Sequence, residues 1–176
     1  AASHQPQDQN RVYFFIDEMQ QIISDGIKLI FEQFRDLPPA LVNRICSDEA
    51  RNNQVVSTFV ENEAKWGSTL IFAATVAQGQ YITSKLLERG VAANEVYGFT
   101  KGFKRREIVE SFQRRQLKVV VNCGLFTEGT DIPGVETVVL ARPTRSEILF
   151  RQMVGRGMRG PKIGGSAECT VVAFFD

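Results

Sequence analysis

The sequence predicts an α/β fold, in which a parallel sheet is flanked by helices on both faces and is preceded by an N-terminal helical segment. Two observations lead to this class. Short, nearly continuous apolar runs recur from residue 68 onward, as is typical of strands that are buried on both faces. Segments with apolar residues at spacings of three and four separate most of these runs, as expected of helices that connect parallel strands.

The first part of the chain is predicted to be largely helical. Residues 1–10 are polar, so we expect them to form a disordered tail. They lack the apolar stretch of a signal peptide. Residues 11–65 are expected to form a helical linker or upstream segment, in which Pro38-Pro39 separates two helical stretches. Gly67 ends the second stretch, so we expect the main domain to cover 66–176.

Strands and helices alternate in the main domain. The predicted strands are 68–74, 94–99, 117–123, 136–142 and 168–176. The predicted helices are 75–90, 104–115 and 145–158. Ligands of parallel sheets bind at the carboxyl ends of the strands. The loops that follow the strands are therefore the places where a site is expected.

Charge and cysteine content narrow the possible partners. The net charge of the chain is only +1, so any nucleic-acid binding must come from local basic clusters. The three cysteines, Cys46, Cys123 and Cys169, stand far apart, and the single histidine, His4, lies in the polar tail. We therefore expect no metal site and a reducing compartment. No apolar run has spanning length, so we expect no membrane contact and a cytoplasmic or nucleoid-associated location.

Thr75 follows the first strand of the main domain and takes the N-cap position of the next helix. The free backbone amides of a helix start can hold a phosphate group. The alternative is that Thr75 is an ordinary capping residue.

A basic cluster, Lys101, Lys104, Arg105 and Arg106, lies at the start of a predicted helix. Cations at this end oppose the positive helix dipole at a cost of a few tenths of a kcal/mol for each charge. A polyanion that passes the loop would reverse this effect. The alternative is a solvated surface that Glu107 and Glu110 partly neutralise.

The stretch after residue 123 is a long loop that carries Gly124, Gly129, Thr130 and Asp131. Long loops between buried strands are usually functional. The glycines would let backbone amides approach a phosphate, and Asp131 would accept a hydrogen bond from a ribose hydroxyl. The alternative is a plain long turn.

The segment "RQMVGRGMRG" places Gln152, Arg156 and Arg159 on one face of a helix, because they are spaced four and three residues apart. Two guanidinium groups on one face can reach the same phosphate chain. Gly155 removes a side chain at the point of closest approach. The alternative is a basic helix end followed by a flexible loop.

Together these segments resemble a known family. Residues 68–176 resemble the second RecA-like domain of superfamily 2 helicases and translocases. "TLIFAAT" is similar to motif IV, "VVVNCGLFTEGTDIPGV" to motif V and "QMVGRGMRG" to the Q-x-x-G-R-x-x-R of motif VI. The order and the spacing of the three motifs also agree with this family.

The resemblance implies a role at an ATP cleft between two RecA-like domains. Arg156 and Arg159 would contact the γ-phosphate of ATP, and Arg159 is the better candidate for an arginine finger. Gln152, Gly155, Gly129 and Asp131 would face the nucleotide. ATP and its Mg²⁺ would be held mainly by the N-terminal RecA-like domain of the same parent chain.

The resemblance also implies a track of nucleic acid across the domain. The candidate contacts are Thr75, Lys101, Lys104, Arg105, Cys123 and Gly124. DEAD-box proteins have His-Arg where Arg151-Gln152 stands here, and Thr-Asp where Cys123-Gly124 stands. The chain is thus more similar to repair helicases and restriction-enzyme motor subunits, so DNA is expected rather than RNA.

The sequence contains no GxxxxGK[ST] cradle for phosphates. The stretch "VYFFI" looks like a strand that leads into Asp17-Glu18, a pair similar to Walker B carboxylates. No phosphate cradle precedes this pair, however, and a helix from Asp17 is the competing interpretation. We therefore expect half of a motor, cut from a longer protein and catalytically incomplete alone. The second hypothesis is a non-catalytic nucleic-acid-binding module that retains the fold.

Overall fold

A computed structural model describes residues 11–15, 38–123, 132, 134–143, 147–157 and 169–174 of the chain. Within 11–15, 147–149 and 156–157 the description is limited to the backbone.

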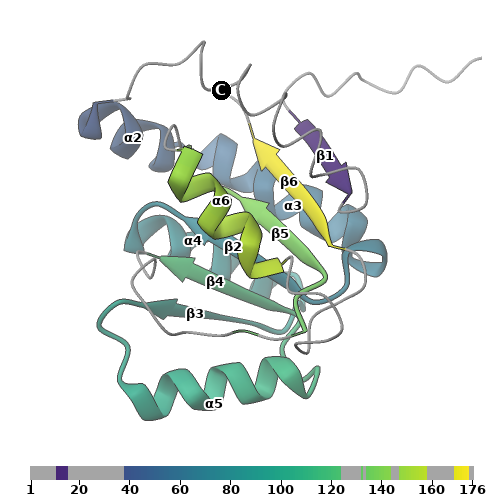
Figure 1. The fold of residues 1–176 in the computed structure, drawn as a ribbon. Coiled ribbons are helices and arrows are strands. Elements are labelled where there is room, and N and C mark those ends of the chain that lie inside the picture. Colours follow the sequence, from purple (N-terminus) through teal and green to yellow (C-terminus); the bar gives the residue numbers. More distant parts are fainter. Residues whose placement is uncertain are drawn as a thin grey trace, which may run out of the picture.

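The centre of the fold is a six-stranded sheet with the strand order β1-β6-β5-β2-β4-β3 (Figure 1). Strands β2 to β6 run parallel to one another, whereas β1 pairs with β6 in antiparallel orientation. All the strands predicted in the main domain are present, and the predicted parallel sheet is confirmed. The bounds are β1 (Arg11–Phe15), β2 (Thr69–Ala73), β3 (Ala93–Tyr97), β4 (Val119–Cys123), β5 (Thr137–Leu140) and β6 (Thr170–Phe174).

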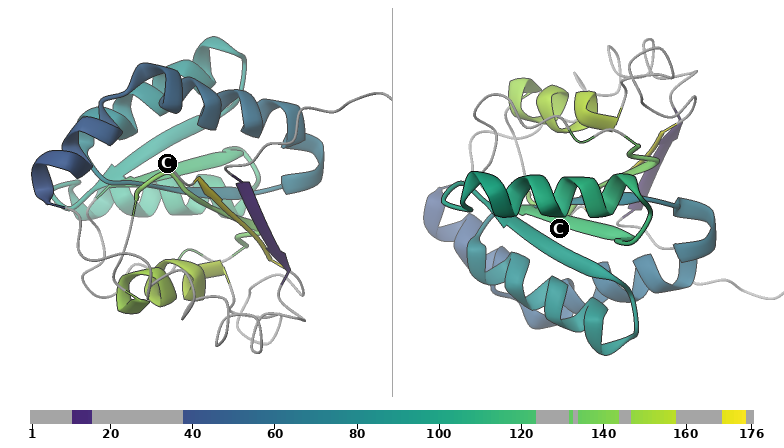
Figure 2. Two further views of the ribbon diagram at one scale, coloured as in Figure 1. Left: turned by 90° about the horizontal axis from the view of Figure 1, so that it is seen from above. Right: turned by 90° about the horizontal axis from the view of Figure 1, so that it is seen from below.

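Helices cover both faces of this sheet. Figure 2 shows α3 and α4 on one face and α5 and α6 on the other, as expected of a chain that crosses between parallel strands. The predicted helices of the main domain are thereby confirmed. The bounds are α2 (Pro39–Cys46), α3 (Glu49–Trp66), α4 (Val76–Glu88), α5 (Gly102–Gln113) and α6 (Glu147–Gly157).

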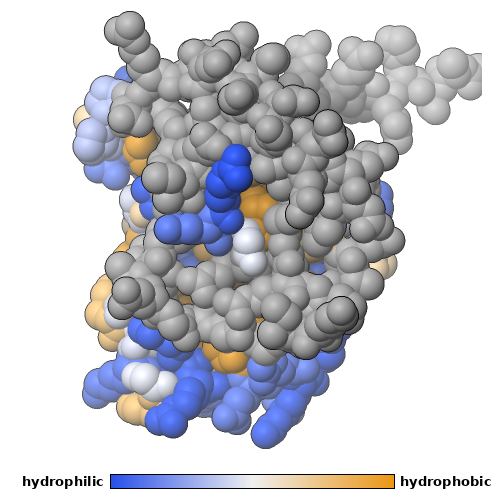
Figure 3. Space-filling model, in the orientation of Figure 1, coloured by the Kyte–Doolittle hydropathy of each residue, from blue (hydrophilic) through white to orange (hydrophobic). Residues whose placement is uncertain are grey.

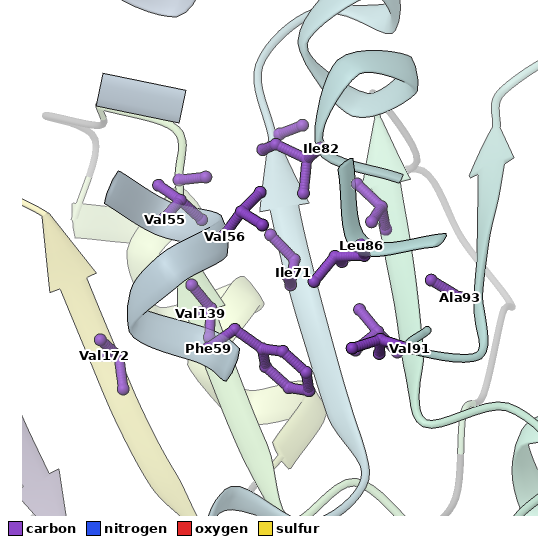
Figure 4. Packing of buried hydrophobic residues seen from close by; sticks show 14 of the residues in the cluster. Val55, Val56, Phe59, Ile71, Ile82, Leu86, Val91, Ala93, Val139 and Val172 are labelled. Atoms are coloured by element: carbon purple, nitrogen blue, oxygen red, sulfur yellow. The ribbon is translucent and has the colours of Figure 1, made fainter. Parts of the chain in front are cut away.

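Two apolar layers hold the helices to the sheet, because alternate residues of each strand point to opposite faces. On one face, Val55, Phe59, Ile82 and Leu86 of α3 and α4 pack against strand residues such as Ile71 (Figure 4). On the other face, α5 and α6 pack on the remaining strand residues, with Ile108, Phe112, Met153, Val154, Leu70 and Phe72 among the buried side chains. Both layers are essentially closed to solvent, so the sheet is a rigid base for its loops.

The structure refines two details of the N-terminal part. The segment 11–65 is not wholly helical, because residues 11–15 form the strand that "VYFFI" resembles, and the backbone of this strand pairs with β6, which would otherwise be an open sheet edge. The helical stretch that ends at Gly67 is divided into α2 and α3, because the Asp48 side chain accepts a hydrogen bond from the Arg51 amide at 3.0 Å and starts a new helix. Asp17-Glu18 lies outside the described residues, and the domain boundary at residue 66 stays a prediction.

We call the edge of the sheet at which the parallel strands begin the amino edge. It carries a cluster of polar groups that form hydrogen bonds with one another. Arg115 donates to both carboxylate oxygens of Glu136, at 2.5 and 3.0 Å, and to the Ser68 hydroxyl at 2.6 Å. Glu136 also accepts from the Ser68 amide at 2.6 Å. The guanidinium of Arg115 holds the pKa of Glu136 below its ordinary value.

Gly67 adjoins this cluster and has a backbone conformation that strongly favours glycine, with φ of 62° and ψ of −143°. A Cβ at this position would collide with the Glu136 carboxylate. The turn between α3 and β2 therefore needs glycine both for its dihedral angles and for the space that Glu136 occupies.

Among the residues that the structure describes, none of the helices combines the length and the apolar character that crossing a bilayer requires. The same residues contain no group of three or more His, Cys, Asp or Glu side chains arranged to hold a metal ion.

Candidate nucleic-acid interface at the carboxyl edge of the sheet

The parallel strands end side by side at the opposite edge, which we call the carboxyl edge. Cys123 at the end of β4 is in register with Ala73 of β2 and with Tyr97 of β3. Leu140 of β5 is likewise in register with Phe72 of β2. The loops after β2, β3, β4 and β5 therefore start next to one another, so candidate residues that lie far apart in the sequence share one edge.

Thr75 caps α4 in the way that its position predicts. Its hydroxyl accepts a hydrogen bond from the Gln78 amide at 3.1 Å, and the Gln78 side chain accepts one from the Ala74 amide at 2.8 Å. This reciprocal pattern is a variant of the capping box. Thr75 is half-buried and its hydroxyl proton is not used in this bond, so the capping role leaves it a donor for a ligand.

The Cys123 side chain lies under α4 and is closed to solvent, with 3% exposure. A Cβ on Gly79 would collide with the Cys123 sulfur, so glycine at this position lets α4 approach β4 closely. Burial raises the pKa of the Cys123 thiol to about 12, which keeps it protonated. Any contact between Cys123 and a nucleic acid would therefore have to use its backbone.

The turn after β3 is braced by four hydrogen bonds. The Thr100 amide donates to the Tyr97 carbonyl at 3.0 Å, and the Tyr97 amide donates to the Thr100 hydroxyl at 2.8 Å. Arg105 then donates to the carbonyls of Gly98 and Thr100, at 3.4 and 3.3 Å. The Nη2 atom of Arg105 thus braces the loop that carries the other basic residues, a role that the sequence does not reveal. The expected contact of Arg105 with nucleic acid stays a prediction.

The start of α5 gathers exposed cations at the carboxyl edge. Lys101 occupies the N-cap position, makes no capping bond with its side chain, and is followed by a first turn without acidic residues. Lys104 pairs with Glu107 on the surface at 3.0 Å. Lys101 and Arg106 are exposed and have no ion-pair partner among the described residues. The cluster therefore keeps uncompensated positive charge beside the positive end of the helix dipole.

Helix α6 presents a different surface on its two sides. Met153 and Val154 are buried against the sheet, whereas Gln152 and Gly155 are exposed. A Cβ on Gly155 would meet nothing within 4 Å, so packing within the described chain gives no reason for glycine at this helical position. An open approach to the backbone fits a ligand or a second domain that lies against this face. Arg156 belongs to α6, but its side chain lies outside the description.

A buried polar network that sequence reasoning missed links three elements behind these loops. Gln78 donates to the Asn52 side chain at 3.0 Å and to the Ala141 carbonyl at 3.2 Å. Arg51 donates to the same carbonyl at 2.7 Å. The partners lie on α3, on α4 and just after β5, so the network fixes the position of the α4 start relative to the segment that leads to α6.

The remaining candidate residues, Gly124, Gly129, Asp131 and Arg159, lie outside the described residues. Their expected contacts with nucleotide and nucleic acid stay predictions.

Comparison with known proteins identifies a family over most of the chain. The family described as "Helicase conserved C-terminal domain" matches residues 50–161. This range contains α3 apart from its first residue and extends through α6, and α3 packs in the same core as the sheet.

Individual relatives agree with this match. The putative ATP-dependent helicase IRC3 of Saccharomyces cerevisiae is 32% identical over 126 residues, which are 70% of this chain and 18% of that protein. The ATP-dependent RNA helicase DBP10 of Pyricularia oryzae is 32% identical over 99 residues, which are 56% of this chain and 11% of that protein. The matched residues thus span about a fifth or less of these relatives.

Solved structures support the fold. The C-terminal domain of the DEAD-box protein Dbp5 is similar with a TM-score of 0.58, at 21% identity, and the match covers 73% of this chain and 71% of that domain.

Proposed function

Because the chain belongs to the helicase conserved C-terminal domain family, we propose that it is the second motor domain of an ATP-dependent nucleic-acid helicase or translocase. In this role the domain supplies an arginine finger to the nucleotide and contacts the backbone of a nucleic-acid strand. The alignment of the strand ends at one edge is the observation that best supports the proposal, because it brings the candidate contacts of separate loops together.

The nucleotide side of the proposal rests on α6. ATP would supply the phosphoryl group whose transfer to water drives the motor. Gln152 and the open backbone at Gly155 would face the nucleotide, and Arg156 and Arg159 would reach its phosphates. The accessible surface at Gly155 is the structural feature that fits this role, since a Cβ there would have no neighbour within 4 Å among the described residues. Asp131 and Gly129 would complete the nucleotide contacts from the loop after β4.

The nucleic-acid side rests on the basic start of α5. Lys101 and Lys104 would bind phosphates of a strand, while Thr75 and the backbone at Cys123-Gly124 would extend the track across the loops after β2 and β4. We propose DNA rather than RNA as the track, on the departures of motifs V and VI from the DEAD-box pattern. A relative named as an RNA helicase makes RNA the alternative that every binding experiment must include.

The decisive experiment measures ATP hydrolysis by the complete helicase with single- and double-stranded DNA and RNA. The Arg159→Ala variant is expected to lose nucleic-acid-stimulated hydrolysis by about 10³-fold or more and to retain nucleotide binding, because an arginine finger acts on the charge of the transition state. The matched control is Arg114→Ala, which removes an exposed arginine from the end of α5 and is expected to leave hydrolysis unchanged.

Full hydrolysis in the Arg159→Ala variant would refute the finger assignment. No hydrolysis by the unaltered protein with any nucleic acid would favour the non-catalytic binding module, for which the uncompensated cations at α5 already provide a surface.

A further inference from the structure

Two phenylalanines are the most exposed large apolar side chains in the described part of the chain. Phe99 is 74% exposed and Phe103 is 64% exposed. They flank Lys101 at the point where β3 leads into α5. A single exposed apolar residue needs no explanation, but two aromatic rings among uncompensated cations form a surface with a specific chemistry.

Phe99 is held in place although its side chain is exposed. Its ring stacks on Tyr97, with a centroid distance of 5.2 Å and an interplanar angle of 23°. Tyr97 itself is only 9% exposed, and the turn between them is braced by the hydrogen bonds of Thr100 and Arg105. An aromatic ring on a braced turn loses little conformational freedom when it binds a partner.

The surroundings of the rings are strongly polar and positive. Lys101, Lys104 and Arg106 are exposed at the same helix start. In Figure 3 the surface over α5, along the lower edge, is mostly hydrophilic and carries small apolar areas toward the loop that leads to the helix. Positive charges that track a phosphate backbone, together with aromatic faces for bases, are the combination that binds single-stranded nucleic acid.

We propose that Phe99 and Phe103 form a base-stacking platform for single-stranded nucleic acid, with Lys101 and Lys104 binding the adjacent phosphates. This inference rests on the proposed function and adds two statements to it. The strand at this edge is unpaired, and the domain contacts its bases as well as its backbone. Because every base has a π-face, the platform discriminates little between sequences.

The test compares the binding of two labelled strands to the 176-residue chain at low salt. One strand is oligothymidylate, and the other is an abasic strand of equal length and charge. The double variant Phe99→Ala/Phe103→Ala is expected to bind oligothymidylate about tenfold or more weakly, and to bind the abasic strand as the unaltered chain does.

Leu87→Ala is the matched control, because Leu87 is 54% exposed near the end of α4, away from the loops of the carboxyl edge. It is expected to leave the binding of both strands unchanged. A Phe103→Trp variant tests stacking directly: its fluorescence is expected to be quenched by oligothymidylate and not by the abasic strand, against the background of the buried Trp66.

Four results would overturn the proposal. Unchanged binding of oligothymidylate by the double variant would refute stacking while leaving the proposed function intact. An equal loss on both strands would show that the rings do not act on bases. Loss of a protein partner with unchanged binding of oligothymidylate would make the rings a protein-docking surface. No binding of either strand by the unaltered chain would contradict both this inference and the nucleic-acid side of the proposed function.

Discussion

In the described part of the chain, charged side chains are paired at one edge of the sheet and partly unpaired at the other. At the amino edge, Arg115, Glu136 and Ser68 bond to one another, and the charge of each ion is balanced within the chain. At the carboxyl edge, Lys101 and Arg106 are exposed with no ion-pair partner among the described residues. The charges at the first edge are therefore neutralised within the fold, whereas the second edge leaves positive charge that an anion could balance.

The comparison shows how surface charge can be assigned to stability or to function. A charge that is matched inside the domain serves mainly to hold two segments together. A cluster of like charges at the wrong end of a helix dipole weakens the fold slightly, so its benefit has to come from a partner. Changes at the amino edge should therefore affect unfolding, and changes at the carboxyl edge should affect binding.

The largest effect is expected from Gly67→Ala at the amino edge. The substitution forces a side chain into a backbone conformation that favours glycine and pushes the Glu136 carboxylate away from Arg115. We expect the free energy of unfolding to fall by about 1–3 kcal/mol, measured by urea denaturation. Affinity for single strands at temperatures well below the transition should stay the same, and a selective loss of binding would contradict the division between the edges.

A smaller effect is expected from Lys101→Ala/Lys104→Ala at the carboxyl edge. The slope of log affinity against log salt should decrease by about 0.7 for each phosphate contact that is lost, while the stability changes by less than about 0.5 kcal/mol. Lys85→Ala is the matched control, because Lys85 forms a surface pair with Glu88 on α4 that is similar to the Lys104–Glu107 pair. Equal slopes in all three proteins would show that the cluster is only a solvated surface.

The smallest effect is expected from Glu136→Gln. The pKa of Glu136 is lowered from its ordinary 4.5 in the folded state, so the carboxylate stabilises the protein above that pH and the contribution is lost as the pH falls through the folded pKa. Because the pair is partly exposed, we expect the variant to be about 0.5–1 kcal/mol less stable near neutral pH. Urea denaturation should find the two proteins equally stable in strong acid, and a pH-independent difference would assign the effect to packing instead.

The strands and helices of the main domain could be predicted because most strands are short apolar runs and each crossing helix has apolar residues at helical spacing. The apolar run "VYFFI" indicates a strand near residues 11–15, but its antiparallel place beside β6 could not be predicted, because β6 lies at the other end of the chain. Asp48 separates α2 from α3 by a single capping hydrogen bond. The break between the two helices was not predicted, because the helical sequence pattern continues across it.

The candidate site was predictable only in part. The register of the strand ends follows from parallel topology, so the gathering of the loops at one edge could be expected. The bracing role of Arg105 depends on two backbone carbonyls, whose direction the sequence does not reveal. The sequence alone could not single out Phe99 and Phe103, because only the structure shows which phenylalanine rings are exposed to solvent.

The buried side chain of Gln78 has a mechanical consequence. It bonds to Ala74 before α4, to Asn52 on α3 and to Ala141 after β5, so none of these segments can shift alone without breaking a buried hydrogen bond. A pull on the start of α4 is therefore transmitted directly to the segment that leads to α6. In the proposed motor, this network would make the start of α4 and the segment before α6 move together as one rigid unit.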